Sequence, residues 1–364
     1  MLHHGSAGVD QGGDASGIAQ VTVIIPTFNR AADVQRALDA LARQTCPGVR
    51  VLVVDNSSTD GTGDQVTARI PQSHGRLGYI RREPNGPASA RNTGLAAATT
   101  PYVLFHDSDI ELPPDWIARA LLRMEQAPEL GAVGGHILYA FDENRVNAYG
   151  GDMGLLGLAW DVDEGTALDH DKPAASRIWI NCSAMLANTE AVRRAGGFDE
   201  TYFYGYEDSD LGWRLSLTGR PVAVFPELHA RHHVDADPGF AHPEIVFHYC
   251  KNRLRTLLKN AGGWHLPLML GGYALYTLAD LALRAPRAPK WRALAWNLSN
   301  LRETLALRRQ VQAGRIVPDA DVLSRGSRRW WPPSRLAGRR RRSATPDVRA
   351  ASPASAGTIS DDRL

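Results

Sequence analysis

The fold is decided by the stretch Tyr102-Val103-Leu104-Phe105-His106-Asp107-Ser108-Asp109. Its first four residues are apolar, which predicts a buried strand with two aspartates at its end. Asp107 and Asp109 share a face if the chain stays extended, or they turn into the next loop. Two close carboxylates need a cation or a proton between them, and Mg2+ or Mn2+ suits such ligands. A strand end with a helix-capping acid is the alternative, because Pro113-Pro114-Asp115 begins a helix soon after.

The composition favours one catalytic domain with an appendage. The chain has 364 residues, with 41 Lys and Arg against 39 Asp and Glu, so its net charge is close to zero. Cys46, Cys182 and Cys250 form neither a metal-binding nor a disulfide spacing, which favours a reducing compartment. Residues 1–20 lack a long apolar core, so we expect a disordered start, no secretory signal and a cytoplasmic protein.

The first hundred residues alternate between strands and helices. Val21 to Pro26 and Arg50 to Val54 are β-branched runs that predict buried strands, and a helix is expected from Ala31 to Gln44. This order predicts a parallel sheet that binds ligands beyond the carboxyl ends of its strands. Asp55 follows the second strand, and it either accepts a hydrogen bond from a base imide or ribose or caps the next helix.

Arg91 is a candidate anion-binding residue. It falls in the early turns of a helix predicted after Asn85-Gly86-Pro87, and a helix start beside an arginine attracts anions. A solvated surface arginine is the alternative.

Four motifs in order resemble the inverting glycosyltransferases of family 2, which have the GT-A fold. The matching segments are residues 24–30, 53–60, 85–94 and 107–109. The resemblance implies an α/β fold with a mostly parallel central sheet flanked by helices, a UDP- or dTDP-sugar donor and an Mg2+ or Mn2+ cofactor. The substrate-binding residues that it implies are Pro26, Thr27, Asn29, Arg30, Asp55, Asn85, Arg91 and Asp107, with Asp109 as a metal ligand.

The middle of the chain is expected to carry the acceptor side. Leu130 to Leu138 and Ile178 to Leu186 predict strands. Residues 142–173 are long for a structureless loop, so they contain either short strands or a mobile cover over the site.

Glu207 and Asp208 are the candidate catalytic acids. They precede a helix predicted to begin near Ser209, so a simple capping role is the alternative. Sugar transfer to a hydroxyl needs a general base, and the family resemblance assigns that role to Asp208, with Glu207 orienting it or the acceptor. The same motif adds Trp213 and Arg214 to the substrate-binding set.

Three histidines, His229, His232 and His233, follow a strand predicted from Val222 to Pro226. They lie in a polar loop or complete an oxygen-rich metal site. The resemblance points to His232 as the second metal ligand, with His233 as the substitute.

These residues predict a single in-line displacement with inversion. The metal and Arg91 stabilise the nucleoside diphosphate leaving group while Asp208 deprotonates the acceptor. The acceptor is expected to be a lipid-linked glycan or a polysaccharide of the cell envelope, with a small natural product as the alternative. A sugar-phosphate nucleotidyltransferase is the alternative enzyme, although residues 26–30 lack its glycine-rich first loop. A membrane-associated scaffold with this fold and no activity is the third candidate.

The C-terminal third is expected to be helical and basic. The expected domains are the catalytic domain at 21–258, a helical appendage at 259–323 and a disordered basic tail at 324–364 that contains Arg339–Arg342. Residues 248–259 predict a basic amphipathic helix. The apolar segment 264–283 either lies in a lipid interface, as a peripheral membrane contact at the inner face of the membrane, or packs as a lid on the catalytic domain. No pattern for specific nucleic-acid binding is present in the sequence.

Overall fold

The computed structural model describes residues 20–234 and 242–326. The expected disordered segments at 1–20 and 324–364 lie outside these ranges except for Gln20 and residues 324–326. The strands are β1 Val21–Thr27, β2 Arg50–Asp55, β3 Leu77–Arg81, β4 Tyr102–His106, β5 Ile110–Glu111, β6 Ala132–Tyr139, β7 Asp142–Ala148, β8 Gly151–Met153, β9 Ala159–Asp161, β10 Ala175–Arg177, β11 Ala184–Asn188 and β12 Val222–His232. The helices are α1 Ala31–Ala42, α2 Thr62–Arg69, α3 Gly86–Ala97, α4 Trp116–Gln126, α5 Thr189–Arg194, α6 Glu207–Leu217, α7 Pro243–Asn260, α8 His265–Leu283, α9 Ala288–Ser299, α10 Leu301–Ala313 and α11 Asp319–Leu323, with a short 3-10 turn at Pro71–Ser73.

A ten-stranded sheet forms the centre of the fold. Eight strands follow the order β10-β12-β6-β11-β4-β1-β2-β3, while β5 pairs with β12 and β7 pairs with β6. Strands β4, β1, β2 and β3 are parallel, while β11 is antiparallel to both β4 and β6. The first half of the chain therefore confirms the predicted parallel sheet. Because Thr27 is in register with Asp55, the carboxyl ends of β1 and β2 meet at one edge.

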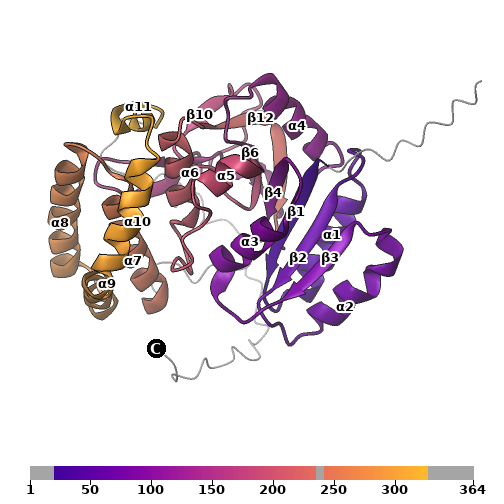
Figure 1. The fold of residues 1–364 in the computed structure, drawn as a ribbon, viewed down its shortest axis with the longest axis horizontal. Helices are drawn as coiled ribbons and strands as arrows, with labels where there is room; N and C mark the ends of the chain where they lie inside the picture. Colours follow the sequence, from indigo (N-terminus) through magenta and orange to yellow (C-terminus); the bar gives the residue numbers. More distant parts are fainter. Residues whose placement is uncertain (1–19, 235–241, 327–364) are drawn as a thin grey trace, which may run out of the picture. The chain divides into compact units, whose positions relative to one another are not determined.

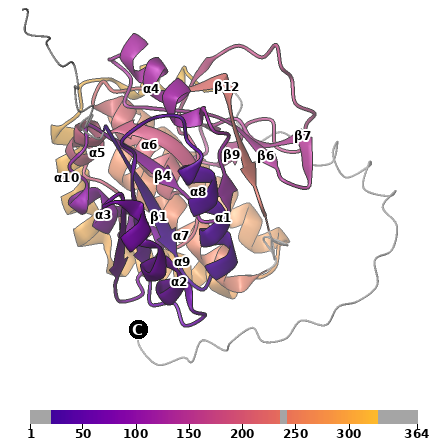
Figure 2. The same cartoon turned by 90° about the vertical axis from the view of Figure 1, so that its right-hand side faces the viewer.

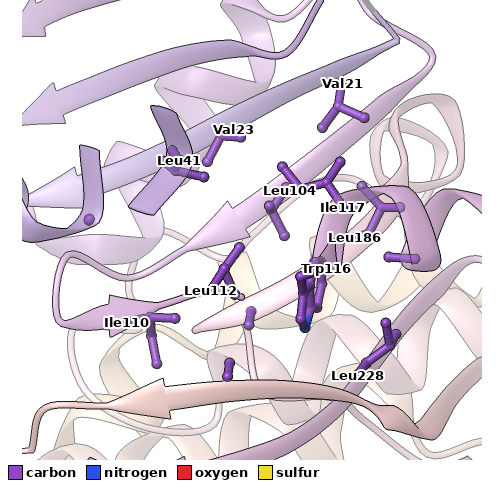
Figure 3. Packing of buried hydrophobic residues seen from close by; sticks show 14 of the residues in the cluster. Val21, Val23, Leu41, Leu104, Ile110, Leu112, Trp116, Ile117, Leu186 and Leu228 are labelled. Carbon is purple, nitrogen blue, oxygen red and sulfur yellow. The ribbon is translucent and has the colours of Figure 1, made fainter. Parts of the chain in front are cut away.

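Helices cover both faces of this sheet because its buried strands alternate their apolar side chains. Val23 and Leu104 face one core, to which α1 and α4 contribute, and Figure 3 shows Trp116 of α4 in that core. Ile24 and Phe105 face the opposite core, which is closed by α3, α5 and α6. A strand that is apolar on both faces is typical of such a layered arrangement.

The helices α7 to α10 gather beside α6, away from the strands β1 to β3, as Figure 1 shows; in Figure 2 they lie behind the sheet. A third apolar cluster joins them to α6 through Trp213, Leu257 and Met269. The predicted basic amphipathic helix is present as α7, but Lys251, Arg255 and Lys259 are buried in it rather than solvated. The continuous helix α7 also crosses the expected domain boundary at residue 258.

Two predicted strands differ from the structure. Only residues 184–188 of the run from Ile178 are in the sheet, and Ile178 to Ile180 are buried as irregular chain. An apolar run signals burial, and by itself it does not fix a strand. The strand predicted to stop at Pro226 continues as β12 to His232 after a shift in register between Val224 and His229. Residues 142–173 contain the short strands β7, β8 and β9, which was one of the two expected outcomes.

Candidate active site

The two aspartates that follow β4 turn out of the sheet. The strand ends at His106, and the backbone N–H of Ile110 donates to the carbonyl of Asp107 at 3.2 Å, which closes a tight turn. Of the two expected arrangements, the loop is therefore the one that forms. The turn places the Asp107 and Asp109 carboxylates beside different partners.

Arg91 joins the two halves of the site. Its guanidinium lies 2.7 Å from Asp107 Oδ1 and 3.5 Å from Glu207 Oε1, so it contacts acids that are far apart in the sequence. The side chain is 4% exposed, which excludes the alternative of a solvated surface arginine. Burial alone would lower the pKa of Arg91, but the acids around it raise the pKa above its ordinary value.

Glu207 and Asp208 occupy the first turn of α6, beside the loop that follows β4. Burial, reinforced by the neighbouring Asp208 charge, raises the pKa of Glu207 to about 7. Burial also raises the pKa of Asp208, although the backbone N–H of Cys182 donates to its Oδ2 at 3.1 Å. Glu207 Oε2 and Asp208 Oδ1 are buried and have no hydrogen-bond partner among the described residues. Unpaired acceptors with raised pKa values are typical of groups that receive protons.

Asp109 faces His232 across the same edge of the sheet. Asp109 Oδ1 and His232 Nε2 are 3.5 Å apart, and His232 Nδ1 lies 2.9 Å from Asn147 Oδ1. Burial raises the pKa of Asp109, but the contact with His232 outweighs it and lowers that pKa. The next residue, His233, contacts Glu111 Oε2 at 3.1 Å instead. Successive residues of an extended chain point to opposite faces, so the side chain of His232, and not that of His233, contacts the Asp109 carboxylate.

Asp109 and His232 fit a divalent cation that takes its remaining ligands from substrate. Two donors that each lie about 2.1 Å from one ion are roughly 3–4 Å apart, which agrees with their separation. If Asn147 accepts the Nδ1–H of His232, the lone pair at Nε2 is left for a metal. Among residues 20–234 and 242–326, no group of three His, Cys, Asp or Glu side chains is arranged to hold an ion. Carboxylates that complete their site with phosphate oxygens are usual for Mg2+.

Asp55 organises the loop after β2. Its Oδ1 accepts from the backbone N–H and the hydroxyl of Ser58, at 2.9 and 2.6 Å, and its Oδ2 accepts from the hydroxyl of Tyr79. Burial and this contact raise the pKa of Tyr79 to about 12. The next helix begins only at Thr62, after Gly61, so Asp55 is not its cap. The fully buried carboxylate has internal donors on both oxygens, and a nucleobase contact would have to share them.

The other predicted nucleoside residues lie at the same edge. Asn29, with a positive φ of 50°, accepts from the backbone N–H of Thr59 at 2.8 Å, so the loops after β1 and β2 are joined. Arg30 precedes α1 and contacts Asp33 at 3.1 Å. A shallow cavity of about 480 Å3 opens here, and it is lined by Asn29, Arg30, Ala31, Ala32, Asp33 and Asp60. Pro26 and Thr27 end β1, and Asn85 precedes α3.

Trp213 and Arg214 do not reach this edge. The Trp213 indole is fully buried and donates to Asp319 Oδ1 at 3.2 Å. The Arg214 guanidinium is buried against Asp210 Oδ2 at 2.7 Å. Both side chains point from α6 into the interior, so the expectation that they bind substrate directly is corrected: they hold α6 in place.

Three contacts of the site were missed by sequence reasoning. They involve Tyr79, Asn147 and the backbone N–H of Cys182. The register of parallel strands offered a signal for Tyr79, because it pairs with Val53, two positions before Asp55. No sequence signal marks Asn147, which lies on β7, or Cys182, which precedes β11, because both contacts depend on tertiary packing.

Comparisons with known proteins concern the family and the fold. Residues 22–170 match the family model for glycosyl transferase family 2. The pre-mycofactocin glycosyltransferase of Mycobacterium tuberculosis is 34% identical over 217 residues, which are 57% of this chain and 43% of that protein. The chain thus spans less than half the length of that relative. The N-acetylglucosaminyl-diphospho-decaprenol L-rhamnosyltransferase of the same species is 25% identical over 296 residues, or 74% of this chain and 95% of that protein.

A solved structure has a similar fold. It is a mannosyltransferase from Pyrobaculum calidifontis in complex with GDP-Man and Mn2+, with a TM-score of 0.50 and 20% identity over 82% of this chain and 86% of that chain. At this identity the likeness concerns the fold alone, and it confirms the expected GT-A class.

Proposed function

Since residues 22–170 match the model of glycosyl transferase family 2, we propose that the chain belongs to this family, moves a sugar from a nucleotide-diphosphate donor to an acceptor hydroxyl and inverts the anomeric configuration. One observation carries the proposal. Arg91 lies between Asp107, from the strand that ends in the predicted metal motif, and Glu207, beside the candidate base. Donor-side and acceptor-side groups therefore share one site.

Asp208 acts as the general base. Its Oδ2 is held by the backbone N–H of Cys182, and its unpaired Oδ1 is available to an acceptor hydroxyl. Glu207 lies beside it, and its raised pKa makes it a neutral hydrogen-bond donor at the lower end of the physiological range. Proton removal as the hydroxyl attacks lowers the barrier by the equivalent of roughly 10²–10⁴ in rate.

Asp109 and His232 hold a divalent cation, Mg2+ or Mn2+. When bound, such an ion neutralises charge that develops on the diphosphate leaving group. Arg91 adds a fixed positive charge beside Asp107. The chain's own carboxylate and imidazole donors support this assignment, and so does the Mn2+ bound by the P. calidifontis enzyme.

A UDP- or dTDP-sugar is the proposed donor, and a lipid-linked glycan or a related polysaccharide is the proposed acceptor. The donor class comes from the motifs alone. The acceptor class is supported by the M. tuberculosis rhamnosyltransferase, whose name gives a decaprenol-linked acceptor and which aligns with 74% of this chain.

Release of nucleoside diphosphate from a panel of sugar nucleotides, with Mg2+ or Mn2+, tests the proposal. The native chain is expected to turn over at least one donor, and Asp208→Asn to lose roughly 10²–10⁴ in rate while donor binding is kept. Asp115→Asn, an exposed carboxylate at the start of α4, is the matched control and should stay at the native rate. Absence of turnover, together with absence of metal-dependent nucleotide binding, would favour the scaffold instead.

Inversion is tested on the product. Proton NMR of the first turnovers with the active donor should show the opposite anomeric configuration. A retained configuration would overturn the in-line mechanism, whatever the acceptor.

A further inference from the structure

The outward side of α8 carries an uninterrupted apolar stripe. Its members are spaced alternately by four and three positions, which places them along one side of a helix. We define the α8 outer face as Trp264, Leu268, Gly271, Leu275, Leu278 and Ala282, all of which are exposed. Leu275 is 72% exposed and Leu278 is 64% exposed. Such a continuous apolar surface normally has a binding partner.

The opposite side of α8 is fixed in the protein. Met269 and Tyr273 are buried in the third core, and Arg253 of α7 lies 4.8 Å from the centre of the Tyr273 ring. By length and composition alone, α8 is the one described helix that could cross a membrane, with a mean hydropathy of 1.4. Because one side packs on protein and Asp280 is paired with Lys290 at 2.6 Å, a position along a surface fits better than a span.

Positive charge lies at the C-terminal end of the α8 outer face, where Arg284 and Arg287 are exposed while Lys290 is buried against Asp280. Residues 262–300 contain four Arg or Lys and one acid, Asp280. At the C-terminal end of α8, the Arg284 side chain is 62% exposed, and Trp291 of α9 is 59% exposed. An apolar stripe with tryptophans and cations at its margins is complementary to an anionic lipid surface. A symmetric pairing with a second copy would instead bring like charges together.

The stripe is connected to the catalytic acids by a short series of contacts. Arg253, which packs on α8, donates to the carbonyl of Leu156. The carbonyl of the next residue, Gly157, accepts from the Tyr206 hydroxyl at 3.0 Å, and Tyr206 directly precedes Glu207. A surface bound at α8 is therefore linked through these contacts to the first turn of α6, which carries the acids.

We propose that the α8 outer face binds the chain to an anionic membrane surface, with α8 lying in the plane of the headgroups. The inference deepens the proposed function, since it supplies the surface on which a lipid-linked acceptor would be met. Binding to lipid is measured independently of sugar transfer, so either proposal can be overturned while the other stands.

Flotation of the full chain with vesicles tests this inference. The native chain is expected to float with phosphatidylcholine vesicles that contain about a third phosphatidylglycerol, and to bind less to phosphatidylcholine alone or at high salt. Leu275→Glu should weaken binding by at least about tenfold, and Leu275→Glu with Leu278→Glu by about a hundredfold. Circular dichroism should show that both variants are folded.

Leu122→Glu is the matched control, because Leu122 is an exposed leucine on α4 and is 50% exposed. It should float like the native chain. The inference is overturned if the native chain ignores anionic vesicles at low salt, or if Leu275→Glu binds them unchanged. A third outcome is that the native chain binds no vesicles but forms concentration-dependent dimers, which Leu275→Glu dissociates. This outcome would identify a second copy as the partner of the α8 outer face, and it would also overturn the inference. Turnover of a soluble donor by the native chain in these cases would leave the proposed function standing.

Discussion

Arg91 contacts acids from two distant parts of the chain. Because Arg91 is buried, its electrostatic interactions with these acids are stronger than they would be in water. In a poorly solvated site, a guanidinium that touches Asp107 and Glu207 stabilises their charged forms. Glu207 nevertheless keeps a pKa of about 7, since burial and Asp208 outweigh the arginine. The site therefore holds one carboxyl that changes protonation near neutral pH.

Glu207 should make the stability of the protein depend on pH. Its folded-state pKa of about 7 lies above the ordinary 4.5, so the folded chain binds the extra proton between these values. Its contribution is full below pH 4.5 and is lost as the pH rises through 7, by an amount on the order of 3 kcal/mol. Urea unfolding at pH 5 and pH 8 should show a smaller loss in Glu207→Gln than in the native chain. Equal losses in both proteins would contradict the raised pKa.

His232 and His233 provide a test with its own control. His232→Ala should lower metal-dependent nucleotide affinity by roughly 10–100-fold, because it removes one of two proposed metal donors. His233→Ala removes a neighbour that contacts Glu111 instead, and should leave that affinity within about twofold. Calorimetric titration of UDP with Mn2+, and then with EDTA, measures both. The assignment is wrong if the two variants behave alike.

At the scale of elements, α6 is the helix that the rest of the site depends on. Its first turn carries Glu207 and Asp208, and its buried Asp210 lies 3.1 Å from Lys259 of α7. The same Lys259 ammonium lies 2.6 Å from Asp199, whose pKa it holds well below the ordinary value despite burial. Helix α7 thus positions α6 through a buried charge network.

Lys259→Met should destabilise the fold by about 3–5 kcal/mol, because two buried carboxylates lose their shared cation. The free energy of unfolding in urea measures this loss. Arg194→Met, which breaks a largely exposed pair with Glu190, is the control and should cost less than about 1 kcal/mol. A small effect of Lys259→Met would mean that water reaches the network.

The sequence was informative where elements are regular. Continuous apolar runs predicted β1, β2 and β4, and the spacing of apolar residues predicted the start of α6 within two positions. The sequence was misleading where a buried segment could adopt more than one structure. The apolar run from Ile178 suggested a strand although most of it packs as irregular chain, and the cations of α7 suggested a solvated face although they pair internally.

Pairwise contacts of the site were predictable only in part. His232 was identified by its spacing from Pro226, and the geometry that separates it from His233 depends on β12 extending past that proline. The role of Arg91 as a bridge required α6 to pack beside β4, which no local pattern encodes. The acid partners of Lys259 likewise depend on tertiary structure.

At the scale of the whole molecule, the helices after the sheet are part of one fold. Arg255 is fully buried between Asp199 and Glu303 of α10, so this residue of α7 links α10 to the segment between α5 and α6. The sequence suggested a domain boundary at residue 258. In the structure, α7 and its contacts continue past this residue.

A chain ended after Leu258 is expected to be insoluble or unfolded. It loses Lys259 and exposes the apolar cluster that α8 and α11 cover. A chain ended after Gly326 keeps all of these contacts and serves as the control. Solubility on expression and far-ultraviolet circular dichroism compare the two. A folded, active product from the shorter chain would contradict the structural role of α7 to α10.

The buried ion pairs that α7 makes with Asp199 and with Asp210 of α6 also limit how this chain can be recombined with its relatives. A chimera that joins this sheet to the C-terminal helices of a distant relative must match Asp199 and Asp210 with two incoming cations. A mismatch would leave an unpaired carboxylate in the interior, which would destabilise the folded chimera. Grafting experiments should therefore exchange both segments or neither.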